Sequence, residues 1–291
     1  MSAEGSPGGS PSGRELAQGL ARTAEQGAGA VPLRLGGMAL RNGLLVHGPT
    51  HWAAAVRTPD GEIVSASGRK PHVTGSVERV PGARGVLRLG EAMAVIPLVK
   101  YALPQAKLPW QDRRVLAGAA AATLGGALLR RRVHGVAGET ALAAVSLLPS
   151  LMALRGGDLA AYHGVEHKAI GAYESGADDA RDATKEHDRC GSHLMAPLLA
   201  SNVAGTALLK RVVASPGRVH EAAISLASIG LAVEVFAWSE RHADSRATWL
   251  LRRPGHELQR LLGTREPTET QLDVGRAALA EILRAEGVAA A

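Results

Sequence analysis

The stretch AAISLASIGLAVEVFAW, residues 222–238, decides the fold class of this chain. It meets the lower limit of about 17 mostly apolar residues for a helix that crosses a bilayer. Glu234 is its one ionisable residue. Such a residue inside an apolar stretch is costly unless it has a function or a partner, and Arg241 is placed to be that partner. The stretch therefore predicts a membrane-spanning helix.

Further apolar stretches, bounded by charged residues or proline, extend the same pattern at residues 86–103, 115–129, 140–154 and 194–213. The second consists mostly of Ala and Gly, which favour close helix contact in lipid but contribute little insertion energy. We predict a mainly α-helical fold, a multi-pass membrane bundle. A soluble bundle of buried Ala-rich helices is the alternative that the pattern allows. The number and orientation of the spans stay open, because Arg88, Glu91 and Lys100 lie within the first stretch.

The composition indicates which class of binding partner the protein has, a lipid bilayer or a nucleic acid. Hydrophobic residues make up 46% of the chain but aromatic residues only 3%, so Ala, Leu and Val supply the apolar content. The formal net charge of +6 suits nucleic acid or an anionic membrane surface. Because no run of Lys and Arg is interleaved with aromatic residues, we expect the lipid bilayer as a partner and no nucleic acid.

The chain divides into four regions by composition. Residues 1–30, rich in Gly, Ser, Ala and Pro, are typical of a disordered tail. Residues 31–80 predict a small β-containing region, and residues 86–240 predict the helical membrane region. A polar loop at residues 155–193 interrupts the membrane region and carries the candidate metal site. Residues 241–291 are expected to form a polar C-terminal region with a helix.

Turn and capping motifs refine the two outer regions. The segment TPDG, residues 58–61, predicts a tight turn between the two strands of a β-hairpin. A further strand is expected around residues 40–46. The segment TETQ, residues 268–271, is a capping box that opens an amphipathic C-terminal helix outside any bilayer, and Gly287 follows as its stop.

Metal-binding residue types cluster in YHGVEHK, residues 162–168. On a helix, His163 and His167 are four residues apart and share one face, so both imidazoles can bind one metal ion. Glu166 lies beside them and can polarise a bound water molecule. The order His-x-x-Glu-His is the one that inverted zinc peptidases use. The alternative is an exposed helix with two His residues and a Glu–Lys face.

A second group of such residues follows in HDRCGSH, residues 187–193. His and Cys three residues apart can chelate from a turn, and a thiolate with imidazoles suits zinc. Cys190 as a small buried thiol is the alternative, and His193 can equally begin the next apolar helix. The two groups together predict a divalent metal cofactor, zinc, with the ligands His163, His167, His187 and Cys190.

Several motifs in order resemble one protein family, namely HGVEHK (163–168), AYE (172–174), HDRCG (187–191), LQRL (258–261) and TREP (264–267). The chain is similar there to domain-of-unknown-function family 1385, the YqhQ-like bacterial proteins. The resemblance implies a multi-pass protein of the cytoplasmic (inner) membrane and a metal-dependent enzyme. It supports as site residues His163, Glu166, His167, His187 and Cys190. It does not support His193.

The chain departs from the family pattern at two positions. The family's opening motif has Gln after a Gly pair and Glu before the next Gly, where this chain has Met38 and Asn42. If that Glu contributes to the site, this protein is an altered or degenerate member.

Three functions fit these patterns. The first is a membrane-bound, metal-dependent hydrolase in which Glu166 accepts a proton from water. Four protein ligands would close the coordination shell, which is typical of a structural site. The second function is therefore a non-enzymatic scaffold with a structural metal, which binds a partner through the β element or the C-terminal helix. The third is a transporter that uses Glu234 and Glu91. The sequence determines neither the substrate nor the oligomeric state.

Overall fold

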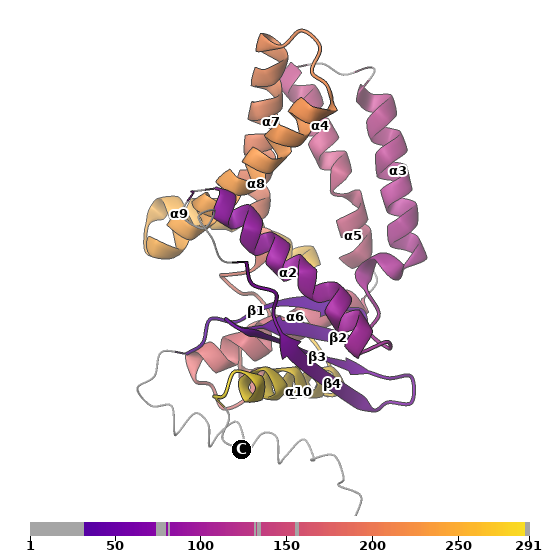
Figure 1. Ribbon diagram of the computed structural model, residues 1–291, viewed down its shortest axis with the longest axis vertical. Helices are drawn as coiled ribbons and strands as arrows, with labels where there is room; N and C mark the ends of the chain where they lie inside the picture. Colours follow the sequence, from indigo (N-terminus) through magenta and orange to yellow (C-terminus); the bar gives the residue numbers. More distant parts are fainter. Residues whose placement is uncertain are drawn as a thin grey trace, which may run out of the picture.

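The computed structural model describes residues 32–73, 80, 82–130, 132, 135–154 and 157–288, so the predicted tail at 1–30 lies outside the described residues. The molecule has two tiers (Figure 1). The lower tier contains β1 (Gly36–Leu40), β2 (Gly43–His47), β3 (His51–Arg57), β4 (Ile63–Arg69), α6 (Asp158–Ser175) and α10 (Glu269–Ala285). The upper tier contains α3 (Arg113–Arg130), α4 (Gly135–Ser146), α5 (Leu148–Leu154), α7 (Met195–Val212) and α8 (Arg218–Arg241). Between the tiers lie α2 (Ala83–Ala102) and α9 (Arg246–Leu258).

The four strands form one antiparallel sheet in chain order, β1-β2-β3-β4. The predicted turn at residues 58–61 is confirmed, because Arg57 pairs with Ile63 across it. The single strand expected around residues 40–46 is wrong, since Leu40 pairs with Gly43 across a two-residue turn. Asn42 holds this turn through its side chain, whose Oδ1 accepts a hydrogen bond of 2.9 Å from the Lys107 backbone N–H.

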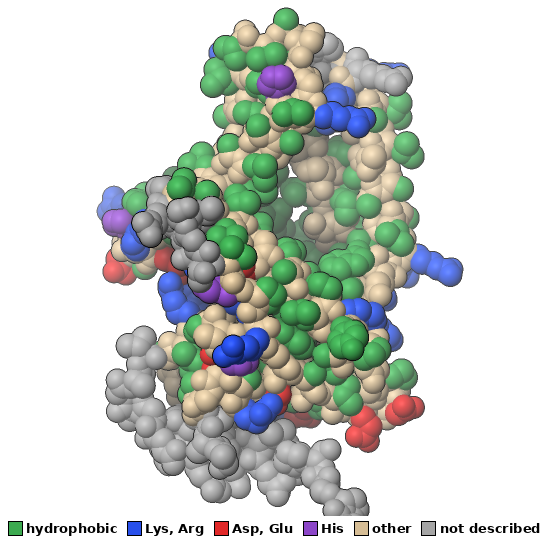
Figure 2. All heavy atoms as spheres, in the orientation of Figure 1, with side chains coloured by type: hydrophobic (Ala, Val, Ile, Leu, Met, Phe, Trp, Pro, Cys, Tyr) green, Lys and Arg blue, Asp and Glu red, His purple; other side chains and the backbone are tan. Residues whose placement is uncertain are grey.

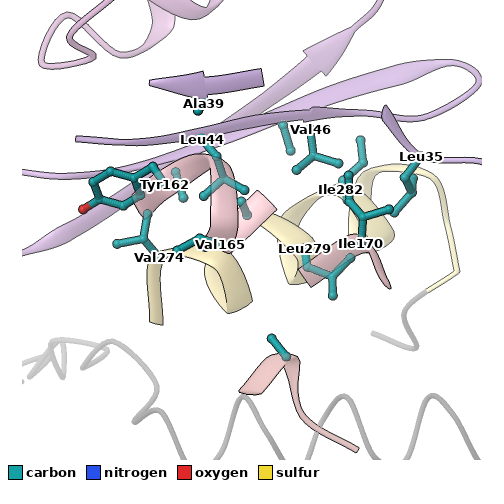
Figure 3. Packing of buried hydrophobic residues seen from close by; sticks show 14 of the residues in the cluster. Leu35, Ala39, Leu44, Val46, Tyr162, Val165, Ile170, Val274, Leu279 and Ile282 are labelled. Carbon is teal, nitrogen blue, oxygen red and sulfur yellow. The ribbon is translucent and has the colours of Figure 1, made fainter. Parts of the chain in front are cut away.

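The sheet is buried on both faces because alternate strand residues point to opposite sides. Figure 3 shows side chains of one face meeting those of α6 and α10, among them Leu44, Val46, Tyr162, Val165, Ile170, Val274, Leu279 and Ile282. Leu45, Trp52 and Val56 point to the other face and pack in a second cluster with Val95 and Val99 of α2. The apolar stretch at 86–103 therefore belongs largely to α2, which covers this sheet.

The predicted C-terminal helix is confirmed as α10, which begins after the capping box at Thr268. Its apolar face packs on the sheet, so the β element and the C-terminal helix bury their apolar surfaces against each other. The 155–193 segment, expected to be a polar loop, contains α6. That helix ends at Gly176, whose left-handed φ of 67° closes it.

The upper tier contains the strongest membrane-span candidates. Among the described residues, two helical segments are long and apolar enough to cross a membrane, and they are Gly135–Leu154 and Arg218–Arg241. Only 11% and 22% of the apolar 18-residue stretch in each of them is buried. Figure 2 shows hydrophobic side chains over much of the surface of this tier. The mainly helical fold and the small N-terminal sheet are thus confirmed, whereas the multi-pass arrangement stays a prediction.

The carboxylates suggested for a transporter have local partners. Glu234 accepts a hydrogen bond of 2.9 Å from the Gly82 backbone N–H. Glu91 accepts one of 2.7 Å from the Val73 backbone N–H and forms an ion pair with Arg88 at 2.8 Å. Both carboxylates therefore hold the chain around the start of α2.

Candidate metal centre

Helix α6 carries the centre of the site and is buried along most of its length. The i, i+4 spacing of His163 and His167 brings their ring centroids to 4.4 Å from each other on one face of the helix. Their Nδ1 atoms face neighbouring backbone segments. Their Nε2 atoms are therefore the candidate ligand atoms, and that of His163 lies 3.4 Å from Cys190 Sγ.

Gly164, between the two histidines, allows another segment to cross α6 closely. A Cβ atom at this position would lie 2.3 Å from the carbonyl oxygen of Arg265, which is far inside van der Waals contact. The Arg265 backbone N–H donates to the carbonyl of Ala160 at 2.9 Å. The same crossing places the Gly263 carbonyl 2.8 Å from His163 Nδ1. A carbonyl can only accept, so Nδ1 carries a proton and Nε2 of His163 is the nitrogen that faces the site.

His167 is held in the same way and has an open nitrogen. Its Nδ1 donates to the Lys185 carbonyl at 2.6 Å. Its Nε2 is buried and has no hydrogen-bond partner among the described residues. A buried polar atom without a partner is costly. In an imidazole whose other nitrogen is fixed by a carbonyl, it is typical of a metal ligand.

Cys190 completes a group of three ligands. It begins the short helix η4 (Gly191–Leu194). Its Sγ lies 3.4 Å from Nε2 of His163 and accepts a weak hydrogen bond from the Ser192 backbone N–H at 3.5 Å. One ligand atom from each of His163, His167 and Cys190 lies within 4.8 Å of the others. Two imidazole nitrogens and a thiolate are a donor set that fits zinc.

His187 lies beside this group but outside it. Its ring centroid is 5.7 Å from that of His167. Its Nε2 bonds to Glu174 Oε2 at 3.1 Å, and its Nδ1 accepts from the Arg189 backbone N–H at 3.3 Å. Both ring nitrogens are therefore engaged, and the structure does not bring this predicted ligand into the group. His193 is also outside it, because its Nδ1 bonds to the Arg252 carbonyl at 3.0 Å.

Gln259 was missed by sequence reasoning, although it positions the Cys190 loop. It lies in a short π-helix, η5 (Gln259–Gly263), and is fully buried. Its Oε1 accepts from the His187 backbone N–H at 2.8 Å, and its Nε2 donates to Ser192 Oγ at 2.8 Å. A π-helical turn often marks a functional site. Gln259 lies in LQRL (258–261), one of the motifs that resemble the family, but the local pattern gave it no role.

A cavity of about 480 Å³ opens beside the ligands. Its lining includes His163, Glu166 and Cys190 together with the first strand, β1. The Oε2 atom of Glu166 lies 4.0 Å from Nε2 of His163. A Cβ atom at Gly37 would lie 2.7 Å from Glu166 Cγ, so glycine there lets the strand approach the carboxylate.

The two positions that depart from the family pattern have different surroundings. Met38 lines the cavity beside the ligands. Asn42 holds the β1–β2 turn and lies outside the lining of this cavity. Any effect of these departures on the site therefore acts most directly through Met38.

The ionisable side chains of the site shift one another's pKa values. Burial lowers the pKa of His163, but its hydrogen bond to Cys190 and the charge of Glu166 outweigh burial and raise the pKa to about 9. Burial, helped by the charge of His163, lowers the pKa of His167 to about 2. Burial raises the pKa of Glu166, against the opposing charges of His163 and His187. His167 is thus a neutral imidazole over the whole physiological range, as a metal ligand must be.

Comparison with known proteins covers the part of the chain that holds this site. Residues 157–285 match the family model described as Protein of unknown function (DUF1385). The family resemblance seen in the sequence is confirmed for that segment, which contains every predicted ligand. The sheet and helices α2 to α5 precede it.

A relative from Bacillus subtilis (strain 168), named Uncharacterized protein YqhQ, is 30% identical over 134 residues. The alignment covers 44% of this chain and 41% of the relative, so the chain spans well under half of the relative's length. No solved structure matches the chain.

Proposed function

We propose that this protein is a membrane-embedded, zinc-dependent hydrolase whose metal is held by His163, His167 and Cys190. The observation that carries the proposal is the buried, unpartnered Nε2 of His167 within 4.8 Å of two other ligand atoms. The hydrogen bonds from both histidines to backbone carbonyls support it, because they fix the tautomer that a metal requires.

The count of three ligands favours an enzyme over a scaffold. A structural zinc site is closed by four protein ligands, whereas a catalytic site has three and keeps one position open. His187, the expected fourth ligand, is bonded to Glu174 instead. The cavity beside the group provides space for a substrate. A scaffold that binds through the β element or α10 is less well supported, because the apolar faces of these elements are buried against each other.

Bound zinc would supply Lewis acidity to the reacting oxygen atoms in this cavity. The residues of the chain supply the rest of the chemistry. Glu166 is buried beside the ligands, and its raised pKa makes it a better base than an exposed carboxylate. It can hold the proton taken from water and return it to the leaving group. The apolar walls, which include Leu35, Leu159 and Ile170, limit the entry of bulk water.

A multi-pass location in the cytoplasmic membrane is supported by the upper tier. At about 1.5 Å per residue, its helices of 18 to 24 residues are about 27 to 36 Å long, close to the thickness of a bilayer core of about 30 Å. The buried positions of α8 are Ser228, Gly230, Ala232 and Ser239, while Leu226 and Leu231 are exposed. Small residues between helices and large apolar residues outside are typical of packing in lipid.

Metal analysis tests the site directly. Protein purified in detergent from the membrane fraction is expected to contain about one zinc ion per chain by mass spectrometry. The His163→Ala/His167→Ala double variant should contain none. His187→Ala is the matched control, because it removes a neighbouring imidazole that lies outside the ligand group, and it should retain the metal. A folded wild type without metal contradicts the proposal, as does a loss in His187→Ala equal to that in the double variant.

Turnover separates the enzyme from the scaffold. Glu166→Gln should keep the zinc and lose at least about 100-fold in hydrolysis of a panel of amide, ester and phosphodiester substrates, the contribution expected of a general base. Wild type that binds zinc but hydrolyses no member of the panel, with no difference from Glu166→Gln, favours the structural-metal scaffold.

A further inference from the structure

Helix α9, which lies between the two tiers, has an exposed face that combines large apolar side chains with arginines. Trp249 and Leu250 are 60% and 64% exposed on it. Arg246 and Arg253 are also exposed. Arg246, the two apolar residues and Arg253 follow one another at positions i, i+3, i+4 and i+7 of the helix, so all four share one face. Among the described residues neither arginine has an ion-pair partner, and the Arg253 guanidinium lies over the Trp249 ring at 5.1 Å from its centroid.

The opposite face of α9 is fixed to the protein. Ser245 caps the helix by accepting from the Thr248 backbone N–H at 3.1 Å, and Thr248 is buried. A Cβ atom at Gly255 would lie 2.6 Å from Nδ1 of His193, so this face packs directly on η4. Because this contact fixes the orientation of α9, Trp249 and Leu250 stay on its solvent-exposed side.

The position of α9 in the chain and in the fold points to a bilayer surface. It follows α8, one of the two segments able to cross a membrane, after a turn of only a few residues. In Figure 1 it lies beside the lower end of α8, at the base of the upper tier. An amphipathic helix with Trp and Leu between cations is typical of a segment that lies in the headgroup region, where arginine meets lipid phosphate.

We propose that α9 is an interfacial helix that binds the surface of an anionic phospholipid bilayer, with Trp249 and Leu250 inserted below the phosphates. The inference rests on the membrane location in the proposed function and not on the metal. Because the inner face of α9 touches η4, this contact holds the Cys190 loop at the level of the lipid headgroups.

Fluorescence quenching in lipid nanodiscs tests the insertion of Trp249. Discs are made with phosphatidylglycerol and phosphatidylcholine whose acyl chains are brominated near the headgroup, or with unbrominated lipids. The difference between wild type and Trp249→Phe isolates the emission of Trp249. Bromination should reduce this component about twofold or more, as expected for a side chain at the headgroup–acyl boundary. Trp52→Phe is the control, since Trp52 is buried in the sheet and its component should not change.

The charge contribution is tested with an Arg246→Gln/Arg253→Gln variant. Its Trp249 quenching should fall in discs that contain phosphatidylglycerol and stay unchanged in discs of phosphatidylcholine. An unquenched Trp249 in protein that is incorporated into discs overturns the proposal while the membrane location stands. Protein that does not enter discs at all overturns both, and zinc content measured on the same samples shows whether the metal site is intact.

Discussion

The two tiers of the molecule differ in which apolar residues they bury and which they expose. In the lower tier the large apolar side chains lie inside, and Leu40, Leu44 and Ile282 are fully buried. In the upper tier Leu124 and Leu208 are exposed, while small residues such as Gly118 lie between the helices. Water drives large apolar side chains inward, whereas lipid exerts no such force and leaves close packing of small residues to hold helices together. The difference supports the proposal that the upper tier meets lipid while the lower tier meets water.

The candidate metal centre lies in the lower tier. Its candidate ligands come from α6 and from the loop before α7, and both segments are fixed by partly buried hydrogen bonds to Gly263, Lys185 and Gln259. The cavity, however, is also lined by Leu154 at the end of α5, the last residue of a candidate membrane span. The site therefore lies at the border between the two tiers.

Replacing an exposed leucine of the upper tier by lysine should have the largest effect on this comparison. Leu231 is 53% exposed in the middle of α8, and Leu231→Lys should cost about 2.5–3.5 kcal/mol of insertion free energy if that face meets lipid. The measurement is the fraction of protein that resists alkaline extraction from membranes. Val288→Lys is the control in the lower tier, where an exposed substitution should change stability by less than about 0.5 kcal/mol.

Equal recovery of these two variants in the membrane fraction would contradict the lipid-facing assignment of α8. It would indicate that its exposed face meets water or a protein partner.

A methyl group on a glycine should distinguish the packing of the tiers with a smaller effect. Gly164→Ala places a Cβ atom against the Arg265 carbonyl, and the strain should cost about 1–3 kcal/mol and weaken zinc retention. At Gly126 in α3 no atom lies within 4 Å of an added Cβ. Gly126→Ala should therefore be neutral, or stabilise α3 by up to about 1 kcal/mol through helix propensity. Thermal unfolding in detergent measures the stability of both variants. An unchanged unfolding midpoint for Gly164→Ala would contradict the close contact between α6 and the Arg265 backbone.

Acid should destabilise the lower tier through His47, with the smallest of these effects. Burial, together with the charge of Lys70, lowers the pKa of His47 to about 4 from an ordinary value of 6.5. The folded protein therefore favours neutral His47, and its contribution to stability is present above pH 6.5 and is lost as the pH falls towards 4. His47→Gln should lose less stability over this interval, by on the order of 1 kcal/mol. Identical pH profiles of the unfolding midpoint for the two proteins would refute this role.

Much of the helical architecture was predictable from local pattern. The five apolar stretches correspond to α2, α3, the α4–α5 segment, α7 and α8, because long periodic segments carry a strong signal. The capping box before α10 was equally clear. The turn at Asn42 was not predictable, because it depends on a hydrogen bond to Lys107, which is distant in sequence. The sequence also could not show that the helix formed by residues 86–103 would pack against the sheet.

The site was predictable in its residue types and less so in its connections. The spacing of His163 and His167 predicted a shared face, and Cys190 was correctly placed among the residues that the fold brings together. His187 could not be assigned from sequence, because its engagement depends on Glu174 and on the backbone geometry of its own loop. Gln259 lies in the LQRL motif, but its role depends on tertiary contacts that no local pattern shows.

X-ray absorption spectroscopy at the zinc K edge of the purified, zinc-containing protein tests the central claim most directly. The account predicts one sulfur ligand at about 2.3 Å and two imidazole nitrogens at about 2.0–2.1 Å, with at least one further light atom in the open position. Cys190→Ser should remove the sulfur contribution and leave the imidazole scattering. A spectrum without sulfur, or with three imidazoles and a closed shell, would contradict the assignment of His163, His167 and Cys190 as an open three-ligand site.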